Sequence, residues 1–97
     1  MVTIEEMRTL ALSFSETEEL PHFEKTSFRV KKKIFATLDE TKHNAVLKFT
    51  VLDQSVFSKA GSAVYPLPNK WGKQGWTIVE LKKVRKDLFK DALTTAY

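Results

Sequence analysis

The sequence contains no cysteine. Disulfide bonds, thiolate nucleophiles and thiolate metal sites are therefore excluded together, and the composition suits a reducing compartment. Long apolar runs are also missing, because no stretch approaches the roughly 18 apolar residues of a membrane-spanning helix. The opening segment MVTIEEMRTL lacks the basic and apolar regions of a secretory signal. We therefore expect a cytoplasmic protein that does not associate with membranes.

Glycine and histidine are scarce, and their positions exclude several common active sites. Gly61, Gly72 and Gly75 fit neither the GxGxxG pattern nor the P-loop pattern, and no GxSxG nucleophile elbow occurs. His22 and His43 have no partner at HxxxH or HExxH spacing. We predict a protein that is not an enzyme and that uses no metal ion or cofactor.

Positive charge is in excess but is unevenly distributed. The net charge is +4, yet residues 1–24 carry one arginine against six glutamates, whereas residues 25–97 carry fifteen basic and six acidic residues. Such a basic segment permits a polyanionic partner, although it is also typical of an ordinary solvated surface. The length of 97 residues, 42% of them hydrophobic, predicts one folded domain spanning residues 1–97.

Amphipathic helices are predicted near both ends of the chain. Thr3 and Glu6 have the spacing of a capping box, and apolar residues then recur at helical intervals from Ile4 to Leu12 or Phe14. The next segment, SETEELPH, is polar and contains a proline, so we interpret it as a connector. The closing helix carries a stripe formed by Val84, Leu88, Ala92 and Ala96.

Alternating apolar and polar residues predict five antiparallel strands between these helices. The strands are Thr26–Val30, Ile34–Leu38, Ala45–Val51, Ala63–Leu67 and Trp76–Leu81. Pro66 places the fourth strand at an edge or a strand end. A short helix from Gln54 to about Ala60, capped by Asp53 and ended by Gly61, is predicted before it. The order α-β-β-β-α-β-β-α predicts an α+β fold, an antiparallel sheet with the N- and C-terminal helices packed on one face.

The strand patterns also predict which side chains the helices leave uncovered. The covered side chains are expected to be Phe28, Val30, Ile34, Ala36, Leu38, Leu47 and Phe49. The opposite face would then carry Arg29, Phe35, Thr37, Val46, Lys48 and Thr50. Two basic hairpin tips, Lys31–Lys33 and Asn69–Gly75, would bound this face.

Both tryptophans of the chain lie at the second tip. Trp76 begins a predicted strand, so packing explains it well. Trp71 lies between Lys70 and Lys73 with Gly72 behind it, where burial is harder to arrange, and an exposed aromatic of this kind often marks a binding surface. Trp71 is therefore the better functional candidate of the two.

The sequence resembles the MmcQ/YjbR family over nearly its whole length. The similarity lies in Leu20-Pro21-His22-Phe23, in residues 27–38, in Ala45-Val46-Leu47-Lys48, in residues 70–79 and in the closing Leu88, Ala92, Ala96 and Tyr97. This resemblance implies a frataxin-like (CyaY-like) fold and DNA binding through a "double wing". The wings would correspond to the two basic tips.

The leading hypothesis is accordingly a DNA-binding protein without catalytic activity. Phosphate contacts are expected from Arg29, Lys31, Lys32, Lys33, Lys48, Lys70 and Lys73. Trp71 would stack or wedge, and Gln74 would donate to a base edge or a phosphate.

Three further hypotheses concern other ligands. The same surface suits a protein-interaction module with Trp71 as its anchor and an acidic partner. A small-ligand site is possible near residues 61–76, in a closed pocket lined by Trp71, Trp76 and Tyr65. The basic residues 82–86 at the start of the last helix predict an anion site there, unless these cations pair with acids of the chain itself.

Overall fold

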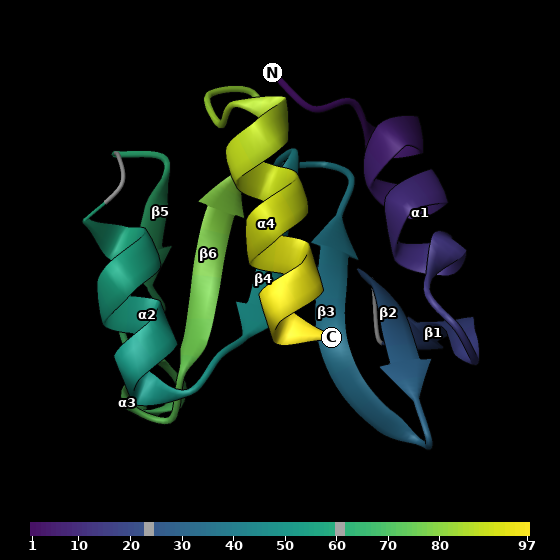
Figure 1. Ribbon diagram of the computed structural model, residues 1–97, viewed down its shortest axis with the longest axis horizontal. Helices are drawn as coiled ribbons and strands as arrows, with labels where there is room; N and C mark the ends of the chain where they lie inside the picture. The colour runs from purple at the N-terminus through teal and green to yellow at the C-terminus, as the bar shows by residue number, and fades with distance from the viewer. Residues whose placement is uncertain (23–24, 60–61) are drawn as a thin grey trace.

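A computed structural model describes residues 1–22, 25–59 and 62–97, and these form an α+β fold (Figure 1). The helices are α1 (Ile4–Ser13), α2 (Val51–Ser58), α3 (Lys70–Lys73) and α4 (Lys86–Ala96). The strands are β1 (Thr17–His22), β2 (Lys25–Val30), β3 (Lys33–Asp39), β4 (Asn44–Lys48), β5 (Val64–Pro66) and β6 (Trp76–Glu80). The predicted fold class is confirmed, with one strand and one short helix more than the sequence pattern indicated.

The strands form a single antiparallel sheet in the order β1-β2-β3-β4-β6-β5. Figure 1 shows α1, α4 and α2 side by side in front of this sheet. The core between the two layers contains Met7, Phe28, Leu38, Leu47 and Phe89, all fully buried. The prediction that both terminal helices pack on one face is therefore confirmed. Pro66 lies in the edge strand β5, as its missing amide hydrogen requires.

The predicted capping box begins α1. The Thr3 hydroxyl accepts a 3.0 Å hydrogen bond from the Glu6 amide, and the Glu6 carboxylate accepts one of 3.0 Å from the Thr3 amide. Helix α4 begins at Lys86, the last residue of the basic segment 82–86 where the sequence pattern placed its start. Residues 81–84 form a turn before the helix. Val84 is nevertheless 2% exposed and belongs to the core.

The segment predicted as a connector is the edge strand β1. It pairs with β2 over its full length, from Thr17 opposite Val30 to His22 opposite Lys25. Its side chains from Glu18 to Pro21 are exposed, so no alternation of polarity marks the strand. Backbone hydrogen bonds to a single neighbour hold it, and the edge position tolerates Pro21.

A bulge in β3 changes the face to which two side chains point. Phe28 pairs with Ala36, but the next residue, Arg29, pairs with Ile34, so Phe35 is an extra residue in β3. An extra residue breaks the strict alternation of faces along a strand.

Phe35 therefore faces the helices, contrary to the prediction. It is 4% exposed, and its ring makes edge contacts with Phe14 at 6.3 Å and Tyr97 at 5.5 Å between centroids. Ile34 instead faces the uncovered side, where it lines a groove together with Thr37. The prediction placed these two residues on the wrong faces because it assumed an unbroken period of two.

Helix α2 begins earlier than predicted. Its N-cap is Thr50, whose hydroxyl accepts a 3.1 Å hydrogen bond from the Asp53 amide, so Asp53 lies in the first turn. Strand β4 correspondingly ends at Lys48, and Thr50 is a cap and not a sheet residue. The predicted helix end at Ala60 and Gly61, like Phe23 and Glu24 before β2, lies outside the described residues.

The β2–β3 hairpin turns through Lys31 and Lys32, which have φ of 52° and 69°. Val30 and Lys33 pair on either side of them, so the loop is a two-residue type I′ turn. Both residues occupy the left-handed region, which disfavours side chains with a Cβ and suits Asn-Gly instead.

Replacing Lys31 with Asn and Lys32 with Gly is expected to raise the free energy of unfolding by about 1 kcal/mol, because the left-handed strain is relieved. The melting temperature should rise by about 4–8 °C. Lys33→Gly is the control, since Lys33 lies in β3 and glycine there should destabilise the fold. A double variant no more stable than the wild type in urea denaturation would contradict the strain argument.

Candidate nucleic-acid interface

The uncovered face of the sheet has an apolar centre. Side chains of residues that pair across neighbouring strands point to the same side of a sheet. Val46 pairs with Thr37 on one side and with Ile78 on the other, so all three lie on this face. The bulge adds Ile34. The sequence predicted a face of cations, hydroxyls and one aromatic, whereas the cations lie toward its margins.

A groove of about 450 Å³ crosses this centre. Its lining residues are Lys25, Ile34, Thr37, Val46, Leu67, Trp71 and Trp76. Trp71 is 49% exposed, while Trp76 is partly buried in β6. Trp71 therefore lies against the end of the sheet and remains half open to solvent. The prediction that Trp76 begins a strand is confirmed, although it packs on the uncovered face and not in the core.

The second basic tip contains a helical turn, α3, where the sequence predicted a plain hairpin loop. The Asn69 side chain caps this turn by accepting a 2.9 Å hydrogen bond from the Trp71 amide. The Gln74 amide then donates to the Trp71 carbonyl at 3.0 Å. The turn fixes the backbone that carries Trp71 and its flanking lysines.

Gln54 anchors α3 to the rest of the molecule, a role that sequence reasoning missed. It lies in α2 and is 7% exposed. Its side-chain nitrogen donates to the carbonyls of Gly72 at 2.7 Å and Trp76 at 3.2 Å, and to the Thr77 hydroxyl at 3.1 Å. A polar residue at the inward face of a predicted short helix was the available signal.

The cations on the β2–β3 side surround the first tip. Lys31, Lys32 and Lys33 are exposed at the turn. Arg29 is partly buried and donates a 3.0 Å hydrogen bond to the Ser27 hydroxyl, which fixes its guanidinium near the sheet. Glu18 lies directly opposite Arg29 in β1.

The cations on the other side surround α3. The Lys48 ammonium donates to the Gln74 carbonyl and lies 5.8 Å from the centre of the Trp76 ring. The Lys70 ammonium lies 5.9 Å from the Trp71 ring, and Lys73 is exposed. Lys48 and Lys70 are thus within the usual reach of a cation–π contact.

The two groups share one end of the sheet, which we call the basic end. Figure 1 shows α3 and the β2–β3 turn at the lower end of the sheet, on opposite sides of it. None of these cations is within 4.0 Å of a described carboxylate, whereas Arg8, Lys83, Arg85 and Lys86 all form ion pairs. The basic end comprises Arg29, Lys31, Lys32, Lys33, Lys48, Lys70 and Lys73.

The opposite end of the same face carries acidic groups. The acidic residues Asp39 and Glu80 lie on either side of Asn44, with which both pair across β3, β4 and β6. A hydrogen bond to the Glu80 carboxylate raises the pKa of Tyr65, and the same bond is the main cause of the lowered pKa of Glu80. Charge on this face is therefore polarised along the strands.

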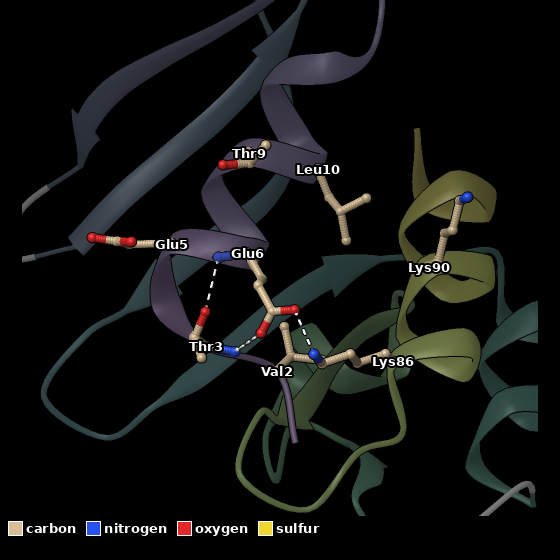
Figure 2. A pocket seen from close by; sticks show the side chains of 8 residues that line it. All are labelled: Val2, Thr3, Glu5, Glu6, Thr9, Leu10, Lys86 and Lys90. Atoms are coloured by element: carbon tan, nitrogen blue, oxygen red, sulfur yellow. Dashed lines mark hydrogen bonds and ion pairs between the residues drawn. The ribbon is translucent and has the colours of Figure 1, made fainter.

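The predicted anion site at the start of α4 is wrong, because three of its four cations pair within the chain. Lys83 lies 3.3 Å from Glu80, and Arg85 lies 2.7 Å from Asp87. The Lys86 ammonium lies 2.9 Å from a Glu6 carboxylate oxygen. Figure 2 marks this ion pair with a dashed line.

This last ion pair lies at a surface pocket of about 440 Å³ between α1 and α4. The hydrogen bond from Lys86, followed by the one from the Thr3 amide, holds the pKa of Glu6 at about 2, against an ordinary value of 4.5. The pocket is thus spanned by an internal ion pair that ties the first turns of α1 and α4 together (Figure 2).

Within residues 1–22, 25–59 and 62–97, no helix is long and apolar enough to cross a membrane. Among the same residues, no three histidine, aspartate or glutamate side chains come together as a metal site would require.

Comparisons with known proteins give one sequence-level and one structural similarity. A family model described as YjbR matches residues 12–97. The crystal structure of the Deinococcus radiodurans protein DR2400, which has the family-model domain DUF419, is similar with a TM-score of 0.84 and 23% sequence identity. The similarity covers 100% of this chain and 77% of that one. At 23% identity this structural similarity shows the fold alone. No curated protein matches the sequence.

Proposed function

This chain belongs to the YjbR family, and from that premise we propose that it is a DNA-binding domain, and not an enzyme, that contacts phosphates through its basic end. One observation carries the proposal: seven cations, none of them paired with a described carboxylate, gather at one end of the sheet. Unpaired lysines at a surface are free to neutralise phosphates and release counterions, which is the main source of non-specific DNA affinity.

The arrangement of the cations supports two points of contact on one duplex. Lys31 and Lys32 project from a two-residue turn with Lys33 beside them at the start of β3, and Lys70 and Lys73 project from α3 on the other side of the sheet end. Lys48 lies between these tips but donates one hydrogen bond internally, so its expected contribution is smaller. Gln74 is exposed beside them and is expected to donate to a phosphate or a base edge.

Salt dependence tests the proposal. Binding of a labelled duplex should weaken steeply with salt, and Lys70→Ala/Lys73→Ala should lower the slope of log K against log salt by about two. The control is Lys59→Ala/Lys90→Ala. It removes the same number of positive charges, one from the end of α2 and one from α4. This control should leave the slope unchanged. Binding that ignores salt, or equal losses in the two double variants, would refute phosphate contact by the basic end.

A protein-interaction module is the second candidate, and the half-exposed Trp71 beside an apolar groove favours it. Interfaces commonly depend on a few aromatic and arginine anchors of this kind. In this case an acidic protein would remain bound after nuclease treatment. The small-ligand hypothesis required a closed pocket lined by Trp71, Trp76 and Tyr65, whereas the groove is open to solvent and Tyr65 does not line it.

A further inference from the structure

The phosphate contacts leave the apolar groove of the uncovered face without a role. Ile34 and Val46 contribute its apolar floor, Thr37 adds a hydroxyl, and the two tryptophans lie at the α3 end. Its volume of about 450 Å³ is within the range of roughly 300–1,000 Å³ that is usual for small-molecule sites. A solvent-exposed groove with this lining suits a flat, aromatic ligand.

The charges around the groove indicate what that ligand carries. Lys25 lines it, while Lys48 and Lys70 lie within 6 Å of the Trp76 and Trp71 ring centres at the other end. No carboxylate is among the described residues that line it. An aromatic ring attached to an anionic backbone is complementary to this arrangement, because the ring stacks on indole and the phosphates meet ammonium groups.

We propose that this groove takes an unpaired nucleobase, so that the domain binds single-stranded DNA in preference to duplex DNA. The inference rests on the DNA-binding function proposed above. Bases in a duplex are already stacked on one another, and a base must leave that stack before it can lie against Trp71. A single strand presents its bases without this cost, and stacking on aromatic side chains is tolerant of sequence.

Both tryptophans of the chain line the groove, so intrinsic fluorescence reports on its occupancy directly. Oligothymidine is expected to quench this fluorescence and to bind more tightly than its duplex with oligoadenosine at equal salt. Trp71→Ala should weaken binding of the labelled single strand by about 5- to 150-fold and should change duplex binding and the salt slope little. Trp71→Phe, which keeps a planar ring, should restore most of the loss.

Leu52→Ala is the control, because Leu52 is 75% exposed on α2 in the helical layer. It removes exposed apolar surface from a residue that does not line the groove, and it should leave both affinities unchanged. Equal affinity for the two DNA forms, or an equal loss of both in Trp71→Ala, would overturn the single-strand inference while leaving phosphate binding intact. Thymidine monophosphate binding as tightly as the oligonucleotide would assign the groove to free nucleotides instead. Absence of binding to either DNA form would refute the proposed function itself.

Discussion

Replacing Gly75 with alanine is expected to lower the free energy of unfolding by roughly 3–5 kcal/mol, from left-handed strain together with steric overlap. Gly75 has a φ of 107°, which side chains with a Cβ rarely adopt. A Cβ on this backbone would also lie 1.9 Å from the Phe49 carbonyl oxygen, so the backbone must move. The loss would be a large share of the roughly 5–15 kcal/mol that stabilises a domain.

The cost reflects how closely two segments meet at the basic end. The Gly75 carbonyl accepts hydrogen bonds from the Phe49 amide and the Thr77 hydroxyl, each at 3.0 Å. Moving Gly75 away from Phe49 would strain both bonds and displace α3, which carries Trp71.

Urea denaturation of two further variants separates the causes. Gly72→Ala places a Cβ 1.9 Å from the Leu67 carbonyl oxygen but is not in the left-handed region, so it isolates the steric contribution. Lys73 is exposed in α3, so the free energy of unfolding of Lys73→Ala should stay within about 0.5 kcal/mol of the wild type. Equal stability of Gly75→Ala and Lys73→Ala would show that the segment adapts freely and would contradict the close packing.

Features that depend on local patterning could be predicted from the sequence. The capping box of α1 requires only Thr3 and Glu6 at the correct spacing, and it is present. Pro66 lies in an edge strand, because a residue without an amide hydrogen cannot donate to a neighbouring strand in any fold.

Features that depend on a distant partner could not be predicted in this way. β1 has no polarity pattern, because its side chains lie at an edge and only its backbone is paired. The bulge at Phe35 brings its ring against Phe14 and Tyr97, which lie at opposite ends of the sequence.

The candidate site was likewise predictable only in part. Its lysines and Trp71 were visible in the sequence, because they cluster along the chain. The apolar groove was not, because it depends on the bulge that brings Ile34 to the uncovered face beside Trp76. Long-range register decides which side chains meet, and a period of two describes a strand only while no residue is inserted.

Gln54→Glu is expected to be the second strongly destabilising substitution. The Gln54 nitrogen faces only acceptors, because the Thr77 hydroxyl already donates to the Gly75 carbonyl. A carboxylate of the same shape would place a buried charge against two carbonyl oxygens and a hydroxyl whose hydrogen is already donated to the Gly75 carbonyl. We expect a loss of roughly 3–5 kcal/mol at neutral pH, the usual cost of an uncompensated buried charge.

Gln54→Met is the matched comparison, because it keeps the volume and removes the donor without adding charge. It should cost about 1–3 kcal/mol, the desolvation cost of the acceptors left unpaired.

The difference in free energy of unfolding between Gln54→Glu and Gln54→Met should depend on pH. Burial and facing acceptors raise the pKa of a carboxyl group above its value in the unfolded chain, so the folded Glu variant binds a proton more readily. Its penalty is therefore fully present above the raised pKa and declines as the pH falls, because the protonated group can donate one hydrogen bond. Urea denaturation at pH 7 and near pH 4 should show the gap from Gln54→Met narrowing. A gap that is absent at pH 7, or that widens in acid, would mean that Gln54 does not hold α3 through these hydrogen bonds, and Trp71 would then be positioned by packing alone.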